Sequence, residues 1–516
     1  MASQSPDTKT GGDQQVAAPQ ADDTVPAVPT DTNTDGDQQA APSQGDETVL
    51  AVPEWDYTVS DAFKIVVTNV IASVPVVGGI LAAIINLLWP NSARDVWAEI
   101  RREVEALINQ KIEEAVYNLI AAKLPGLNDS SKLYLNLVTG NASGETIRTQ
   151  WIATNTVYTA AASEFMNSNY EWVLGPLFAI FSVTHMTLLR DVVLHGQEWG
   201  WPIDDYKVYV QFTKDTLDKY LAYYEKVLKN RYDALASFLP PPGQHNTETY
   251  KHWQPYNNQS VIGFDDYRVL VRYLDPFEHP GATPPSELPF QDVYTPAIGT
   301  ADDWDRTASA WSEWGVTTPW SKPLKGIRDI YIEFFDSGPR VLQVHHDDGT
   351  GPMMWGDPSH RNNEYSIIAD PQKGVETALF QLKSSSDYTY NVKGAIIRAG
   401  SIPLGATLIM YDDSEVFLWD KKLIIGGSSI PMLYEGRMLT TLNMWTLSKF
   451  YNSCLGCLIL GFSRDPKILS ETASRVLYVA SINELPPELK KRITVTPDME
   501  EERKEFWRHI RSYGDA

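Results

Sequence analysis

The feature that most constrains this chain is a run without charged side chains in the first half of the sequence. Residues 172–189 read WVLGPLFAIFSVTHMTLL and contain no Lys, Arg, Asp or Glu. From Leu177 to Leu194 apolar side chains fall on every helical face, as in the centre of a bundle or in a membrane span. The length, about 18 to 20 residues, also suits a bilayer's hydrocarbon core. We expect a buried core helix in the resting state, and both environments can apply in turn.

Three further features of the sequence characterise this predicted helix. Pro176 suits a first helical position, where its missing N–H would have no partner. The uncharged run ends at Arg190 and Asp191, which we interpret as structural ion pairing rather than an active-site pair. His185 lies inside the helix, where a neutral core histidine is the simpler interpretation and a pH-sensitive element is the alternative.

Composition and charge exclude several classes of function. The 516 residues include 16 Trp and 25 Tyr, as in a folded protein with roughly two to four domains. The formal net charge of −23 argues against nucleic acid and against simple adhesion to anionic lipid. Only Cys454 and Cys457 occur, so no disulfide framework is expected. Their C-x-x-C spacing in a strand-like run favours packing over metal or redox chemistry.

Residues 1–55 differ from the rest in composition. They are acidic, with Lys9 as the single base, and they repeat with a period of 24, since GDQQ at 12–15 recurs at 36–39. The first 53 residues hold almost no large apolar side chain, so they cannot offset the entropy of ordering. We predict a disordered, removable tail. The start, MASQSPDTKT, shows no secretory signal.

Residues 56–280 carry helical patterns. The uncharged stretch 65–93 is interrupted by Pro75 and Gly78-Gly79, which favours two short helices meeting at a bend. Apolar residues at three- and four-residue spacings predict one amphipathic helix over 93–124, which Pro125-Gly126 ends. A second, over 145–166, carries Trp151, Val157 and Phe165 and precedes the apolar helix. Further helices are predicted over 203–238 and 258–274. These six or seven helices predict a bundle with the apolar helix at its centre.

Residues 288–481 read instead as an all-β domain. Short β-branched and aromatic runs are separated by Pro and Gly, with Asp348-Gly349 as a strong hairpin signal and Asp412-Asp413 as a weaker one. Residues 482–516 form an extension with one short helix, which Thr496 can cap and Pro497 can begin. The runs predicted as strands are 327–335, 341–346, 395–397, 407–411, 416–419 and 457–462.

The sequence contains no convincing catalytic motif. Phosphate loops, nucleophile elbows and helical His pairs are missing from the sequence. The best candidate is His345-His346-Asp347-Asp348, where His345 and Asp347 could bind a metal, but a polar hairpin end before Gly349 is the simpler interpretation. We therefore expect no enzyme activity, no cofactor and no metal site.

Several ordered blocks resemble the Cry-type insecticidal δ-endotoxins. VEALINQKIEEA at 104–115 and LPGL at 124–127 are similar to that family's second-to-third-helix region. VPVVGG at 74–79 and LWP at 88–90 look like its opening helices. TLLRDVVLHGQEWG at 187–200 looks like the end of its central fifth helix. The segments around Trp253 and at 269–277 are similar to its seventh helix, and DVYTP at 292–296 resembles the strand that opens its second domain.

The resemblance implies a seven-helix, pore-forming bundle followed by a β-prism-like domain with receptor-binding loops. The helices over 145–166 and 176–194 would insert into the target membrane as a hairpin, with oligomerisation on insertion. The expected partners are membrane lipid and a cell-surface receptor or glycan. The receptor-loop candidates are Asp336, Ser337, Arg340, Asp412 and Asp413. The expected membrane-inserting side chains of the apolar helix are Leu177, Phe178, Ile180, Phe181, Val183, Met186, Leu188 and Leu189.

The sequence departs from the family after residue 480. The 36 remaining residues are too few for the family's third, sugar-binding type domain, so we expect a two-domain relative. It would be soluble or stored in inclusions in the producing cell and would act extracellularly at target membranes. The alternative is a carbohydrate-binding, lectin-like protein whose bundle is only a scaffold. A third, non-toxic relative with a storage or surface role is also open.

Overall fold

The computed structural model describes fifteen segments, and the helices and strands below all belong to one compact unit, Val52–Ala516. The described segments are 58–73, 76–239, 247–281, 288–299, 326–335, 338–349, 353–356, 375–382, 391–420, 427–434, 436–447, 454–465, 468–469, 471–482 and 485–513. The acidic tail predicted for residues 1–55 lies outside them, so that prediction is not addressed.

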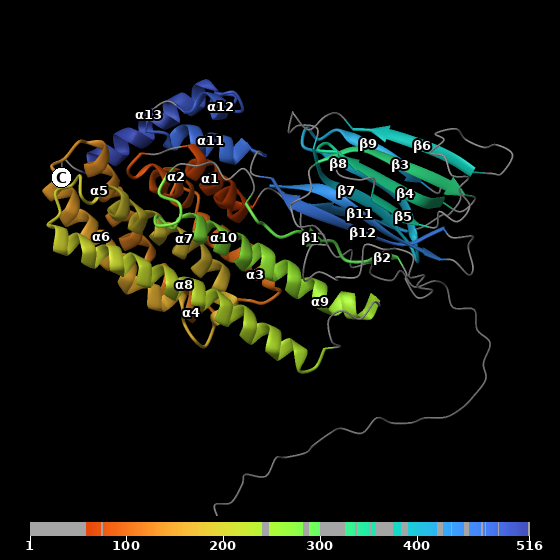
Figure 1. The fold of residues 1–516 in the computed structure, drawn as a ribbon, viewed down its shortest axis with the longest axis horizontal. Helices are drawn as coiled ribbons and strands as arrows, with labels where there is room; N and C mark the ends of the chain where they lie inside the picture. The colour runs from red at the N-terminus through yellow and green to blue at the C-terminus, as the bar shows by residue number, and fades with distance from the viewer. Residues whose placement is uncertain are drawn as a thin grey trace, which may run out of the picture. The chain divides into compact units, whose positions relative to one another are not determined.

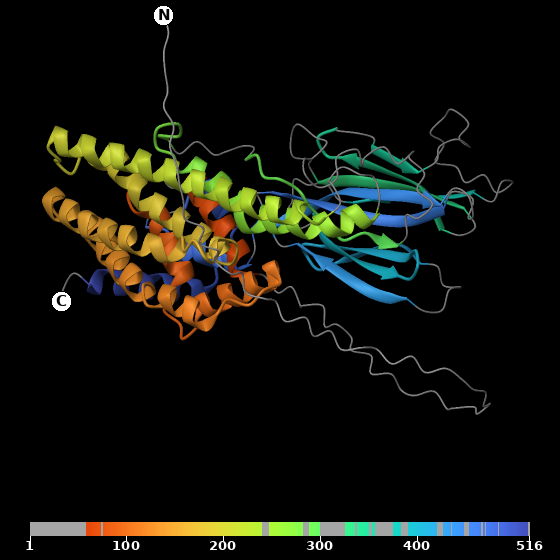
Figure 2. The same cartoon turned by 90° about the horizontal axis from the view of Figure 1, so that it is seen from below.

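The described part of residues 58–281 is helical (Figures 1 and 2). Its helices are α1 Val59–Ser73, α2 Gly79–Leu88, α3 Val96–Ile108, α4 Glu114–Ala121, α5 Leu124–Thr139, α6 Gly144–Phe165, α7 Glu171–His195, α8 Ile203–Ala236, α9 Thr247–Ser260, the π-helical turn η1 Val261–Asp265, and α10 Asp266–Tyr273. The helical bundle with a central apolar helix is confirmed, as are the separate α1 and α2.

The helical segments outnumber the expected seven for local reasons. The single helix predicted over 93–124 is wrong, because Asn109 adopts a left-handed backbone (φ 50°) and separates α3 from α4. Asparagine tolerates this conformation and commonly ends helices. The Pro125-Gly126 pair, interpreted as a helix end, also opens α5, since proline is favoured in a first turn.

Helix α7 starts earlier than the sequence predicted. Pro176 lies inside it, five residues after Glu171, rather than at its first position. The Gly175-Pro176 step is closely packed. A Cβ atom on Gly175 would lie 2.1 Å from the Phe264 ring, and one on Gly263 would lie 3.2 Å from Pro176. Helix α7 is therefore closely apposed to η1 at the Gly175-Pro176 step.

The strands form three antiparallel sheets of four strands each within the described residues, which fits the expected β-prism-like half. One sheet has the order β1-β12-β11 with β2 also on β12, and the others run β10-β7-β8-β9 and β5-β4-β3-β6. The strands are β1 Val293–Tyr294, β2 Ile298–Gly299, β3 Ile327–Phe335, β4 Gly338–His346, β5 Met353–Gly356, β6 Val375–Gln381, β7 Val392–Ala399, β8 Pro403–Met410, β9 Glu415–Asp420, β10 Ser428–Leu433, β11 Arg437–Leu447 and β12 Cys454–Arg464.

Both predicted hairpin turns are confirmed. Gly349 (φ 80°) lies between β4 and β5, and Asp413 (φ 62°) lies between β8 and β9. Positive φ is readily adopted by glycine and tolerated by Asp, which is why these residues mark turns.

After the last strand the chain returns to the helical core. Helices α11 Glu471–Ala480, α12 Pro487–Lys490 and α13 Pro497–Ser512 follow it and share one buried apolar cluster with α1–α8 and α10. Figures 1 and 2 show these blue helices beside α1, α2 and α5. The predicted cap of α13 is confirmed, since Met499 N–H donates to Thr496 Oγ1, and Phe506 of this helix is buried. The strands pack in a second cluster.

Candidate functional site

Helix α7 is enclosed by the rest of the bundle. It is the one helix among the described residues that is long and apolar enough to cross a membrane by length and composition, and 94% of its apolar window is buried. It packs against α6, α8, α10, η1, α2 and α3. All eight side chains expected to enter a membrane are at most 2% exposed: Leu177, Phe178, Ile180, Phe181, Val183, Met186, Leu188 and Leu189.

The predicted hairpin partner, α6, packs on α7 through aromatic rings. The Phe165 ring stacks on that of Phe181 with centroids 4.4 Å apart. Trp151 is fully buried and donates its indole N–H to the Leu188 carbonyl at 2.8 Å. Val157 is half-buried against the same cluster. The partner residues predicted from the sequence therefore all contact the core that contains α7.

Helix α8 covers another side of α7 with tyrosines that the sequence analysis noted only as composition. Phe178 lies 5.3, 4.6 and 5.3 Å, ring centre to ring centre, from Tyr220, Tyr223 and Tyr224. The spacing of three and four residues puts these rings on one helical face. That spacing in the sequence could have predicted a row of tyrosines on the face of α8 that packs on α7.

His185 and Ser182, two buried polar side chains of α7, form hydrogen bonds inside the bundle. His185 Nδ1 lies 2.7 Å from Tyr220 Oη, and its Nε2 lies 2.9 Å from Asn155 Oδ1. Because an amide oxygen only accepts, the proton belongs on Nε2 and Nδ1 accepts from the tyrosine. Burial lowers the pKa of His185 to about 3. Ser182 Oγ and Tyr224 Oη form a further hydrogen bond of 2.8 Å.

Arg190 and Asp191 do not form the predicted ion pair. Consecutive helical residues point in different directions. Arg190 Nη1 donates to the Leu274 carbonyl (3.3 Å), whereas Asp191 Oδ2 accepts from Tyr134 Oη–H (2.9 Å) and from Gly78 N–H (3.1 Å). Burial raises the pKa of Asp191 to about 6. These residues tie the end of α7 to α10, α5 and the start of α2.

The predicted receptor-loop residues are dispersed. Asp336 and Ser337 lie outside the described residues, and Arg340 belongs to strand β4. Asp412 and Asp413 are exposed in the β8–β9 turn, where Asp413 pairs with Lys393 Nζ.

The metal candidate is also accounted for. His345 Nδ1 contacts Asp329, on the neighbouring strand β3, and His346 Nε2 donates to the Thr440 carbonyl at 2.8 Å. Within the described segments no cluster of three or more His, Cys, Asp or Glu side chains suits a metal ion. Burial raises the pKa of Cys457 to about 12, which disfavours a reactive thiolate.

Together these features define the class of protein by its architecture. It has a helical bundle around one apolar helix of membrane-spanning length, followed by antiparallel sheets. Comparison with known proteins then supports the resemblance to a known family. The family model "delta endotoxin, N-terminal domain" matches residues 65–275, which run from within α1 to just past α10.

Curated relatives support this resemblance. Pesticidal crystal protein Cry19Ba of Bacillus thuringiensis subsp. higo is 30% identical over 177 residues, which are 32% of this chain and 26% of that protein. Pesticidal crystal protein Cry8Ba of Bacillus thuringiensis serovar kumamotoensis is 26% identical over 262 residues, 46% of this chain and 21% of that protein. The chain thus spans about a quarter or less of these relatives.

Solved structures agree on the fold. The insecticidal crystal protein Cry7Ca1 of Bacillus thuringiensis superposes with a TM-score of 0.54 at 18% identity, covering 79% of this chain and 75% of that one. PirB superposes with a TM-score of 0.57 at 13% identity, covering 79% of this chain and 94% of that one. The helical part of the chain thus matches the delta-endotoxin N-terminal domain, and the resemblance to Cry delta-endotoxins seen in the sequence is confirmed.

Proposed function

We propose that this protein is a pore-forming toxin that inserts α6 and α7 into a target membrane as a helical hairpin. The observation that carries the proposal is α7, an apolar helix of 25 residues held inside a bundle. About 20 residues are needed to cross a bilayer's hydrocarbon core. Pro176 has no N–H to pair with the Trp172 carbonyl. The other backbone groups of the helix interior are paired within the helix, so the part of α7 that follows Pro176 can exchange protein for lipid without exposing unpaired backbone.

The surface of α6 supports its role as the water-facing partner. Its outer face is free of charged side chains over four turns, whereas its inner face packs on α7. The exposed residues between Thr149 and Ser163 are Thr149, Ile152, Ala153, Thr156, Thr159, Ala160 and Ser163. Such a face tolerates water and the headgroup region alike, and it avoids the cost of burying a charge in lipid.

The remaining parts of the proposal rest on the resemblance to Cry delta-endotoxins. We propose that the sheets recognise a cell-surface receptor or glycan, with the exposed Asp412-Asp413 turn as a candidate contact, and that several copies assemble on insertion. We also propose that the chain is no enzyme. Relatives named pesticidal crystal proteins support storage in the producing cell before action at an outside membrane.

A charge in the middle of α7 tests the proposal. Phe181→Asp should reduce dye release from lipid vesicles roughly 100-fold, because an aspartate at the bilayer centre costs about 3 kcal/mol. Phe181 is also core, so activity is compared per mole of folded protein, with folding checked by circular dichroism and urea unfolding.

The matched control is Leu477→Asp, a charge at an equally buried site in α11, outside the proposed hairpin. It should destabilise the fold while folded molecules keep their lytic activity. Equal loss in both variants, or none in Phe181→Asp, would refute the insertion of α7. If the wild type releases no dye from any vesicle, even after proteolytic removal of residues 1–53, and the protein binds glycans, then the lectin-like alternative holds.

A further inference from the structure

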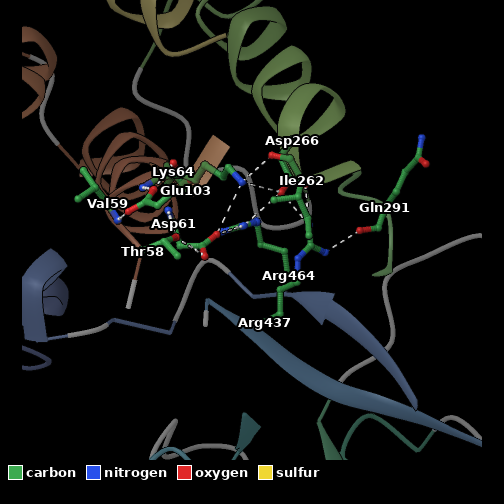
Figure 3. A network of polar contacts seen from close by, with 12 residues as sticks. Thr58, Val59, Asp61, Lys64, Glu103, Ile262, Asp266, Gln291, Arg437 and Arg464 are labelled. Carbon is green, nitrogen blue, oxygen red and sulfur yellow. Dashed lines mark hydrogen bonds and ion pairs between the residues drawn. The ribbon is translucent and has the colours of Figure 1, made fainter. Parts of the chain in front are cut away.

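A buried cluster of charges joins parts of the chain that are far apart in sequence. Asp61 and Lys64 come from α1, Asp266 from α10, Arg437 from β11 and Arg464 from β12 (Figure 3). The side chains of Lys64, Asp266, Arg437 and Arg464 are at most 2% exposed. Among the described residues this cluster connects the helical bundle to the strands through ionised groups.

Asp266 is the hub of the cluster. Its two carboxylate oxygens accept from Arg437 Nη2 at 2.9 and 2.7 Å, and Oδ2 accepts from Arg464 Nη2 at 3.1 Å. Lys64 Nζ lies 3.5 Å from the same oxygen. Although burial alone would raise the pKa of Asp266, these cations hold it below its ordinary value. Asp266 thus contacts three buried cations, of which Lys64 (3.6 Å) and Arg464 (3.1 Å) also contact Asp61. Removing the charge of Asp266 leaves Arg437 without its paired carboxylate and the other two cations with Asp61 alone.

The cluster also fixes the π-helical turn η1. Lys64 Nζ donates to the Ile262 carbonyl at 2.8 Å, so α1 holds η1 directly as well as through Asp266. π-Helical turns of this kind are frequent at functional sites. Lys64 and Asp266 therefore attach η1 and α10 together.

The segment held in this way covers the start of α7. The ring of Phe264, in η1, stacks on Trp172 with centroids 4.8 Å apart and fills the space above Gly175. Both η1 and α10 pack on α7. A continuous set of contacts thus leads from β11 and β12 through Asp266 to the first turns of the apolar helix.

We propose that this cluster is a latch: the strand residues Arg437 and Arg464 and the helix residue Lys64 hold η1–α10 closed over the start of α7 through Asp266. Opening the latch frees α7 to leave the bundle. The consequence for lysis rests on the proposed function, whereas the structural coupling does not.

Amide hydrogen exchange of the full chain tests the coupling without any membrane. Asp266→Asn keeps the side chain's size and removes its charge. Exchange should become roughly tenfold faster or more in α1, η1, α10 and the first turns of α7, because these segments lose their shared anchor. Exchange in α5 and α13, which do not contact the cluster, should remain as in the wild type.

The neighbouring residue supplies a matched control. Asp265 is also buried, but it pairs with Arg268 (2.8 Å) rather than with the cluster. Asp265→Asn should therefore leave exchange in α1 and α7 unchanged. If both variants speed exchange equally, or if Asp266→Asn speeds it uniformly in every helix, the hub is merely structural and the latch is refuted.

Two further measurements keep the outcomes separate. If Asp266→Asn does not fold, Lys64→Met removes one cation while leaving the Arg–Asp contacts, and the same selective pattern should appear at smaller size. An absence of selectivity there also refutes the latch.

In vesicles, folded Asp266→Asn should release dye faster than wild type. Selective exchange with no dye release from either protein retains the latch and rejects the pore-forming function, whereas lysis without selective exchange rejects the latch.

Discussion

At the scale of single residues, the buried interior of the protein contains groups that respond to pH in opposite directions. Burial lowers the pKa of His185 to about 3, so the folded state keeps this ring neutral. Burial raises the pKa of Asp191, Asp265 and Asp292 to about 6 each. The contribution of these carboxyl groups to the free energy of unfolding is present below their unfolded pKa near 4 and is lost as the pH rises through about 6.

The histidine contribution has the opposite sign and can be isolated by substitution. An unfolded histidine binds a proton below about pH 6.5, while folded His185 does not until about pH 3, so its contribution is lost as the pH falls between these values. Between pH 7 and pH 5 we expect the wild type to lose about 2 kcal/mol relative to His185→Gln. Urea unfolding of both proteins at the two pH values measures this difference.

The control for that measurement is an exposed histidine. His509 lies on the outer face of α13, and His509→Gln should track the wild type within about 0.5 kcal/mol. A His185→Gln protein with the same pH dependence as the wild type would mean that His185 is protonated in the fold. The neutral Nε2–H tautomer would then be incorrect, because Nδ1 of a protonated ring cannot accept from Tyr220.

At the scale of elements, the sequence was most informative where one physical signal dominated. The uncharged run predicted α7, and the Pro and Gly residues between 75 and 79 separated α1 from α2. Glycine and aspartate marked the hairpins that the structure shows. The break at Asn109 was not predicted, because a residue with a left-handed backbone does not change the spacing of apolar residues in the sequence. Helix α5 was not predicted, because Pro125 was interpreted only as the end of the preceding helix.

The candidate site was predictable to a similar degree. The apolar side chains of α7 were foreseen because burial of a uniformly apolar helix needs no partner to be specified. Its partners Tyr220, Tyr224 and Asn155, and the hub Asp266, were not foreseen. They act across 30 or more residues of sequence, and nothing local distinguishes a buried charge from a solvated one.

The junction of α7 with η1 gives a prediction with an unusual sign. Glycine to alanine inside a helix ordinarily stabilises by about 1 kcal/mol. Gly175→Ala should instead destabilise by about 1–3 kcal/mol, because the new methyl group would lie 2.1 Å from the Phe264 ring and overpack the junction. Urea unfolding monitored by tryptophan fluorescence measures the change, since Trp172 stacks on the same ring.

A double-variant cycle separates this contact from a general loss of stability. Phe264→Leu makes room at the junction, so adding Gly175→Ala to it should cost clearly less than adding Gly175→Ala to the wild type. If the two costs are equal, then Phe264 does not restrict Gly175, and the packing of η1 on α7 is not what the structure shows.

At the scale of the whole molecule, the chain leaves the helical core, forms the sheets, and returns to the helical core. Phe290 and Leu469, on either side of the sheets in sequence, lie in the same apolar cluster as α7 and α13. The fold therefore cannot be divided into two parts that are consecutive in sequence. The charge cluster around Asp266 adds a second connection between helices and strands. Stability of the N-terminal helices should thus depend on residues at the far end of the chain.

Phe506 tests this dependence. It is 1% exposed and packs in the cluster shared by α13, α11 and the bundle. Phe506→Ala should lower the free energy of unfolding by about 3–5 kcal/mol, the usual cost of a large cavity. Amide exchange should become faster in α1, α2 and α5, more than 300 residues away in sequence, because these helices pack on α11 and α13. Phe417→Ala, at a 56% exposed position in β9, is the matched control and should change stability by less than about 0.5 kcal/mol. If the effect of Phe506→Ala stays within α13, that helix is an appendage and the return of the chain to the bundle contributes little to its stability.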